Sequence, residues 1–274
     1  MKAITTIKYL LALTLISLVA ACGSSSTDTR ILDTTDSYTV EYIPGATDAT
    51  QGKTSFQFKV TDKTTNNPIT GATASIKPVM VMTDKTHSTP VESVTESSTP
   101  GTYNATAYYL MSSSGGVWTL NIIINDETAS FVIDVAMDTT AVTTLSALIS
   151  GSDLVMGSPR KYKLFRESLT GSAGTYSFNF FVAAMETMMS WPAIDIGVLG
   201  ITSVDVQVSL DASDWISYPV TDNGSGHFTV NDLSLSEGIQ DEIYVKLIVN
   251  GEVKTTDGAD PDGNNDYTTF SVTP

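Results

Sequence analysis

The feature that most constrains this chain is a succession of short runs of alternating apolar and polar residues, which begins near Ser37 and continues to the C-terminus. Turn residues separate the runs at intervals of about ten residues, a spacing typical of antiparallel β-sandwiches. Phe56, Phe58 and Val60 share one parity, and so lie on one face of a strand. The strands that the pattern predicts in the first half are 38–43, 55–61, 72–82, 90–95, 101–110, 117–124 and 129–136.

The alternation stops between Met137 and Pro159, where the sequence is first Thr-rich and then carries Gly151 and Gly157. It resumes in runs at 161–169, 175–182, 203–210, 215–220, 226–231, 242–250, 252–256 and 267–272. Asn250-Gly251 between two of these runs is a strong hairpin signal, because both turn positions need positive φ. The sequence therefore predicts an all-β fold of two tandem immunoglobulin-like β-sandwiches, at 37–138 and 160–274, joined by a linker at 139–159.

The segment from Ala183 to Pro192 departs from this pattern. Met185, Met188 and Met189 are spaced i, i+3 and i+4, which predicts one face of a short helix that ends at Pro192. We expect this helix face to pack on a sandwich.

The N-terminal segment has the composition of an export signal. Positive charge at Lys2 and Lys8 accompanies an apolar run from Tyr9 to Val19, which is too short for a membrane-spanning helix. The Ser-, Thr- and Asp-rich residues that follow, up to 36, predict a flexible tether. We expect a signal peptide at 1–21 and the tether at 22–36.

The end of that signal, Val19-Ala20-Ala21-Cys22, resembles the lipobox of bacterial lipoproteins, in which the cysteine thiol carries a diacylglyceryl group. The resemblance implies lipidation of Cys22, the only cysteine of the chain. The alternative is an ordinary secretory signal that leaves a free thiol. Gly23 after the cysteine, in place of the Asp that resembles an inner-membrane retention signal, favours the outer membrane.

Composition excludes several classes of function. A net charge of −16 makes nucleic acid an unlikely partner and repels anionic headgroups, so membrane attachment depends on the lipid anchor. With one cysteine and two histidines, the chain lacks a Cys-based zinc cluster and has few options for imidazole catalysis. No nucleophile, base and orienting acid occur at interpretable spacing, and there is no Gly-rich phosphate loop. We expect a protein that is not an enzyme.

Several elements of the first half occur in a distinctive order: a strand ending at Asp62, Pro68-Ile69-Thr70-Gly71-Ala72, Met80-Val81-Met82 with His87, Gly101-Thr102-Tyr103, and the stretch from Met111 to Trp118. Together they resemble the YtkA-like and FixH-like family of small periplasmic β-sandwich domains, over roughly residues 37 to 138. Members of that family are implicated in copper handling around respiratory oxidases.

The resemblance implies a copper(I) site formed by Met80, Met82, His87 and Met111, since thioether and imidazole ligands suit this soft ion. The alternative for Met80 and Met82 is core filling, because they share parity on one strand. The alternative for His87 is a solvated loop residue.

A second metal hypothesis concerns the C-terminal loop. Its oxygen-bearing residues alternate around Gly263 and resemble in part a calcium loop: Asp260, Asp262, Asn264 and Asp266. The alternative is an ordinary hairpin loop. Taken together, the sequence predicts a non-enzymatic binding module of the cell envelope, a copper-binding accessory lipoprotein. The competing hypothesis is a structural lipoprotein that contacts another envelope protein and has no metal function.

Overall fold

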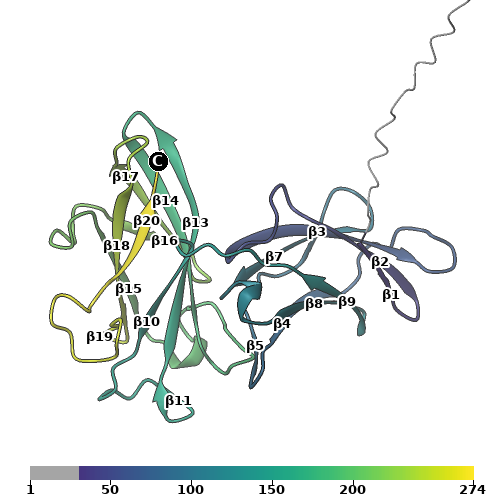
Figure 1. Cartoon of the computed structure of the whole chain (residues 1–274), viewed down its shortest axis with the longest axis horizontal. Coiled ribbons are helices and arrows are strands. Elements are labelled where there is room, and N and C mark those ends of the chain that lie inside the picture. Colours follow the sequence, from purple (N-terminus) through teal and green to yellow (C-terminus); the bar gives the residue numbers. More distant parts are fainter. Residues whose placement is uncertain (1–30) are drawn as a thin grey trace, which may run out of the picture.

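The computed structural model describes residues 31–274 (Figure 1). The signal at 1–21, Cys22 and the first part of the predicted tether lie outside the described residues, so these predictions stay predictions. Apart from strands, the described residues form two short 3-10 helices, η1 (Ser113–Gly115) and η2 (Val198–Gly200). No helix within 31–274 has the length and apolar character needed to cross a membrane.

The first sandwich consists of two antiparallel sheets. One contains, in spatial order, β1 (Ile31–Thr34), β2 (Tyr38–Ile43), β3 (Gly52–Asp62), β7 (Thr102–Tyr109) and β6 (Thr95–Glu96). The other contains β5 (Thr86–Ser88), β4 (Ala74–Val81), β8 (Val117–Ile124) and β9 (Glu127–Ile133). The orders β2-β3-β7-β6 and β5-β4-β8-β9 correspond to the A-B-E-D and C′-C-F-G sheets of immunoglobulin domains.

The second sandwich repeats this topology. One sheet contains β10 (Val142–Ser146), β13 (Lys161–Ser172), β14 (Thr175–Ala184), β17 (His227–Ser234) and β16 (Val220–Asp222). The other contains β15 (Val204–Ser209), β18 (Asp241–Val249) and β20 (Thr268–Val272), with β19 (Glu252–Val253) folded back on β18. A separate hairpin joins β11 (Leu154–Val155) to β12 (Ser158–Pro159). The prediction of an all-β, immunoglobulin-like sandwich fold is confirmed.

Two predicted boundaries need correction. β1 lies inside the predicted tether at 22–36, where it pairs with β2. β10 and the β11–β12 hairpin lie inside the predicted linker at 139–159, and Leu145 of β10 pairs with Tyr162 of β13. In both places Thr and Asp hide the apolar alternation, although β-branched Thr itself favours strands. The second sandwich therefore begins near Ala141.

The predicted helix after Ala183 is also absent from the structure. Ala183 and Ala184 complete β14, and a turn follows in which Thr187 and Ser190 form a bridge. The amide of Ala184 bonds the carbonyl of Pro192, so the segment doubles back on itself. In the predicted strand at 90–95, only Val91 and the terminal Thr95 are paired.

Aromatic side chains fill the core of each sandwich. Trp118 is fully buried in the first, where Phe58 stacks on Tyr103 at 5.3 Å between ring centroids. In the second, Phe178 and Phe180 of β14 both contact Phe270 of β20. Burial of large apolar side chains is the main source of stability in a chain whose described part has no cysteine.

A third apolar cluster joins the two sandwiches, which lie side by side in Figure 1. Tyr108 and Leu110 of the first half pack against Phe165, Phe181 and Trp191 of the second. Tyr108 stacks on Phe181 with 4.2 Å between ring centroids. We call this contact the domain junction.

Gly101 offers a test of the turn that precedes β7. Its φ is +72°, and an added Cβ would lie 2.8 Å from the Val60 carbonyl oxygen and from Pro68 Cβ. Gly101→Ala should therefore lower the free energy of unfolding of the first sandwich by about 2–3 kcal/mol. Gly71 is the matched control, because its φ is +65° but nothing lies within 4 Å of an added Cβ. Gly71→Ala should cost about 1 kcal/mol in the same urea titration; equal losses would contradict the packing argument.

Candidate functional site

A small pocket next to the domain junction contains most of the residues predicted to bind copper. It measures about 210 Å³ and is lined by Met82, Lys85, His87, Leu110, Met111, Lys163, Met188 and Trp191. We call it the methionine pocket. Sites for drug-sized ligands typically span about 300–1,000 Å³, so this pocket suits an ion or a very small molecule.

His87 presents one ring nitrogen to this pocket. Its Nδ1 lies 3.1 Å from the carbonyl oxygen of Ser88, which can only accept a hydrogen bond. Nδ1 therefore carries the proton of the neutral ring, and Nε2, 3.2 Å from the sulfur of Met111, keeps a lone pair. The side chain is only 4% exposed, so the alternative of a solvated loop residue is wrong.

The methionines on and after β4 differ in their surroundings. Met80 is fully buried, pairs with His87 across β4 and β5, and belongs to the core of the first sandwich. Met82 follows the end of β4, is half-buried and lines the methionine pocket. Core filling therefore describes Met80, while Met82 has the access that a ligand needs.

Met111 lines the methionine pocket and also approaches Met80. Its terminal methyl and that of Met80 are 3.2 and 3.5 Å from where a Cβ on Gly115 would be. Because Gly115 has no side chain, both methionines approach the turn that contains η1. The structure thus brings all four predicted copper ligands to one end of the first sandwich.

Trp118 holds His87 and Met111 in place. Its Nε1 donates to the carbonyl oxygen of Met111 at 2.9 Å, and its ring meets His87 edge-on at 5.2 Å between centroids. Trp118 is fully buried and does not itself line the pocket, so it supports His87 and Met111 from the core of the first sandwich. Outer groups of this kind commonly fix the orientation of metal ligands.

The second sandwich contributes Met188, which the helical spacing had assigned to packing. The turn that replaces the expected helix brings Met188 to the pocket, and the carbonyl of Met188 accepts from the amide of Ser88 at 3.0 Å. The methionine cluster was visible in the sequence, but its meeting with His87 depends on the domain junction. No short-range pattern encodes that meeting.

Positive charge surrounds the methionine pocket. Burial lowers the pKa of His87, and Lys85 and Lys163 lower it further by charge repulsion. Burial likewise lowers the pKa of Lys163, whose ammonium donates to Thr144 Oγ1 at 2.7 Å. The two ammonium charges beside the neutral imidazole repel a divalent cation more strongly than a monovalent one.

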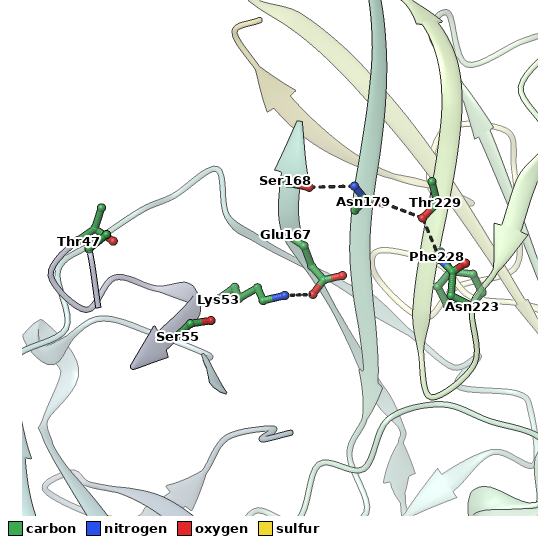
Figure 2. A pocket seen from close by; sticks show the side chains of 10 residues that line it. Thr47, Lys53, Ser55, Glu167, Ser168, Asn179, Asn223, Phe228 and Thr229 are labelled. Carbon is green, nitrogen blue, oxygen red and sulfur yellow. Dashed lines mark hydrogen bonds and ion pairs between the residues drawn. The ribbon is translucent and has the colours of Figure 1, made fainter. Parts of the chain in front are cut away.

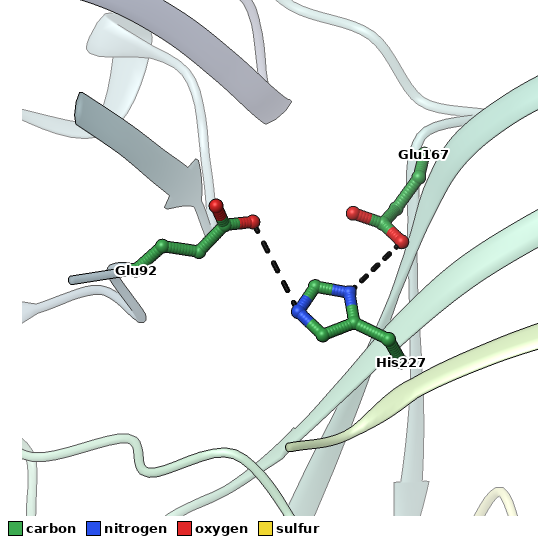
Figure 3. A group of neighbouring side chains, drawn as sticks. All are labelled: Glu92, Glu167 and His227. Atoms are coloured by element: carbon green, nitrogen blue, oxygen red, sulfur yellow. Dashed lines mark hydrogen bonds and ion pairs between the residues drawn. The ribbon is translucent and has the colours of Figure 1, made fainter. Parts of the chain in front are cut away.

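A second cluster lies across the domain junction (Figure 3). His227, the first residue of β17, stands between two carboxylates, with Nδ1 3.1 Å from Glu167 Oε2 and Nε2 4.0 Å from Glu92 Oε1. Glu167 is the extra residue at a bulge in β13, and a bulge re-aims its side chain out of the regular alternation. Glu92 belongs to the first sandwich, so the cluster joins the two halves.

Two further side chains complete this cluster, and both come from the first sandwich. Lys53 Nζ lies 2.6 Å from Glu167 Oε1, and the Tyr108 hydroxyl lies 2.5 Å from Glu92 Oε1 and 2.7 Å from Glu167 Oε1. A single hydroxyl proton faces two carboxylates there. Burial raises the pKa of Tyr108, and the two carboxylates add to this effect.

A polar cavity of about 520 Å³ opens beside Lys53 and Glu167 (Figure 2). Its wall on the second sandwich is a row of hydrogen-bonded side chains: Asn179 donates to Ser168 Oγ at 2.9 Å, and Thr229 donates to Asn179 Oδ1 at 2.6 Å. Asn223 donates to Thr229 Oγ1 at 2.8 Å. Because these groups satisfy one another, the row by itself identifies no ligand.

Glu167 gives a pH prediction for the domain junction. Burial opposes its ionisation, but hydrogen bonds from His227, Lys53 and Tyr108 outweigh this and lower its pKa to about 2. The lowered pKa of the Glu167 carboxyl stabilises the folded protein at pH above the unfolded value of about 4.5. This contribution, on the order of 3 kcal/mol, is lost as pH falls through about 2. Melting temperatures of the wild type should fall over this interval more than those of Glu167→Gln. If the melting temperatures of the wild type and of Glu167→Gln fell by the same amount over this pH interval, the prediction would be wrong.

The C-terminal loop does not gather the four predicted calcium ligands. Asp266 pairs with Lys246 at 3.0 Å, and Asp262 accepts from the backbone amides of Asn264 and Asn265. Asp260 accepts from Ser150, a partner outside the loop. The amide of Asn265, which was not a predicted ligand, holds the loop by donating to Asp257 and to the Asp260 carbonyl. The calcium site stays a prediction that this geometry does not support.

Comparisons with known proteins identify no relative by sequence: no family model and no curated protein matches the chain. Among solved structures, titin domains z1z2 in complex with telethonin align with 87% of this chain and 96% of that chain, at 10% identity and a TM-score of 0.23. The conserved domain protein from Bacillus anthracis aligns with 89% of this chain and 88% of that chain, at 12% identity and a TM-score of 0.32. At such scores the likeness carries no argument about function.

Proposed function

We propose that the protein is a non-enzymatic copper-binding module of the cell envelope that holds one Cu(I) ion in the methionine pocket. The observation that carries this proposal is the contact between Nε2 of His87 and the sulfur of Met111, which are 3.2 Å apart. In the tautomer that donates Nδ1–H to the Ser88 carbonyl, both of these atoms present lone pairs. A soft ion bound by both would relieve this contact.

The ligand set selects the ion. His87, Met111, Met82 and Met188 offer one imidazole and up to three thioethers, which suit Cu(I) far better than they suit Zn²⁺ or Mg²⁺. The nearby charges of Lys85 and Lys163 favour the ion of lower charge. The Nδ1–H bond to the Ser88 carbonyl is the outer contact expected of a metal-binding histidine.

We also propose that the module acts at the membrane surface, anchored through a lipid on Cys22. The motif that precedes this cysteine supports the anchor, and the strongly negative chain gives no other means of holding an anionic membrane. Such a protein delivers or buffers copper for other envelope proteins. Replacing Cys22 by Ser should move it from the membrane fraction to the soluble fraction; unchanged fractionation would contradict the anchor.

The test of copper binding is a competition titration of the full chain with a chromogenic Cu(I) chelator under reducing conditions. We expect one equivalent of Cu(I) in the wild type and none held against the same chelator in His87→Gln. Because the pKa of His87 is lowered by burial, proton competition should weaken binding only at pH below about 6.5. Equal binding by both proteins, or none by either, favours a structural lipoprotein without a metal function.

A further inference from the structure

The Glu92, Glu167 and His227 cluster has the charge of a site for a divalent cation. With a neutral imidazole, its two carboxylates carry a charge of −2. In this structure, Lys53 supplies one compensating charge, with its Nζ 2.6 Å from Glu167 Oε1. A divalent ion held between the two carboxylates would compensate both of them.

The geometry of the cluster also fits a metal. One ligand atom from each of Glu92, Glu167 and His227 lies within 4.8 Å of the other two, the only such group of three among residues 31–274. Ligands at about 2.0–2.2 Å from a tetrahedral ion are roughly 3.5 Å apart, so the side chains need to close by about 1 Å. The Glu92 side chain is 36% exposed, and its movement toward the ion would lengthen the 2.5 Å hydrogen bond that its Oε1 accepts from Tyr108.

Lys53 does not block the site. Its side chain is 32% exposed and reaches Glu167 from the rim, so it can move into solvent when an ion takes its place. The imidazole has a carboxylate next to each ring nitrogen, as Figure 3 shows.

We propose that Glu92, Glu167 and His227 form a binding site for Zn²⁺ that spans the two sandwiches. Carboxylate and imidazole ligands without sulfur suit this borderline ion and are poor ligands for Cu(I). Three protein ligands with a fourth position open to water form a common zinc geometry. Because Glu92 comes from one sandwich and the other two ligands from the second, the ion would fix the angle between them.

The two histidines of the chain allow a crossed test, since each belongs to a different site. Calorimetric titration of the full chain with ZnCl₂ at pH 7.5 should give one equivalent bound by the wild type and by His87→Gln. His227→Gln and Glu92→Gln should bind at least about tenfold more weakly. Thermal unfolding without metal establishes that each variant folds, and half-buried Glu92, whose side chain is the most exposed of the three, provides the variant least dependent on packing.

The zinc affinity of the Lys53→Met variant distinguishes a zinc site from a cluster of ion pairs that binds no metal. If zinc displaces Lys53 from Glu167, removal of this competing ammonium should raise the zinc affinity several-fold. The assignment is overturned by absence of zinc binding in the wild type, by equal binding in His227→Gln, or by a zinc affinity that Lys53→Met leaves unchanged. Since His87→Gln is expected to lose Cu(I) and keep zinc, failure of one site leaves the other independently testable.

Discussion

Replacing Met111 by leucine should weaken Cu(I) binding by about 100-fold or more, because it removes the thioether that faces Nε2 of His87. Leucine nearly conserves the volume of methionine, so the fold should persist at a cost below about 1.5 kcal/mol. The competition titration with a Cu(I) chelator measures the affinity, and urea unfolding measures the stability.

Met80→Leu is the matched control for Met111→Leu. Met80 is fully buried in the core and does not line the methionine pocket, so we expect this variant to keep its Cu(I) affinity. Met82→Leu should fall between the two, since Met82 lines the pocket without a contact to His87 as close as that of Met111. A loss of affinity in Met80→Leu as large as in Met111→Leu would contradict the assignment.

The second prediction with a large expected effect concerns the free energy of unfolding of the first sandwich. Trp118→Ala should lower the free energy of unfolding of the first sandwich by about 3–5 kcal/mol, the usual range for a fully buried aromatic side chain. It would also release the Met111 carbonyl and remove the edge contact to His87. We therefore expect Cu(I) binding to be lost in whatever fraction remains folded.

Trp215→Ala is the control for Trp118→Ala. Trp215 is half-buried in the second sandwich, where its ring lies 4.2 Å from Lys246 Nζ, a contact worth about 1 kcal/mol. Its removal should leave the first sandwich and its copper affinity unchanged. If denaturant titrations gave equal losses for the two variants, the central place of Trp118 in the first core would be wrong.

The fold followed from the sequence wherever the apolar alternation was intact. The runs at 38–43 and 117–124 match β2 and β8 residue for residue. The sequence predicts a linker where β10 lies, because threonine dilutes its apolar signal. The pairing of buried Leu145 with Tyr162 of β13 is not visible in the local sequence. The prediction of a helix at 185–191 is wrong because i, i+3 and i+4 spacing over one turn cannot separate a helix from a bent loop.

One of the two candidate sites could likewise be predicted from the sequence, and the other could not. His87 and Met111 could be named from a sequence motif, and the structure places them 3.2 Å apart. The Glu92, Glu167 and His227 cluster could not be foreseen, because it needs residues from both sandwiches and a bulge at Glu167. Both proposed sites lie beside the domain junction, and each includes residues from both sandwiches.

The measurement that tests the central claim most directly is X-ray absorption at the copper edge of the Cu(I)-loaded full chain. We expect a first shell of sulfur with one nitrogen, in the wild type and in His227→Gln alike. The nitrogen contribution should disappear from any copper that remains bound in His87→Gln, and the sulfur contribution should fall in Met111→Leu. A first shell of nitrogen and oxygen without sulfur in the wild type would contradict a copper site in the methionine pocket.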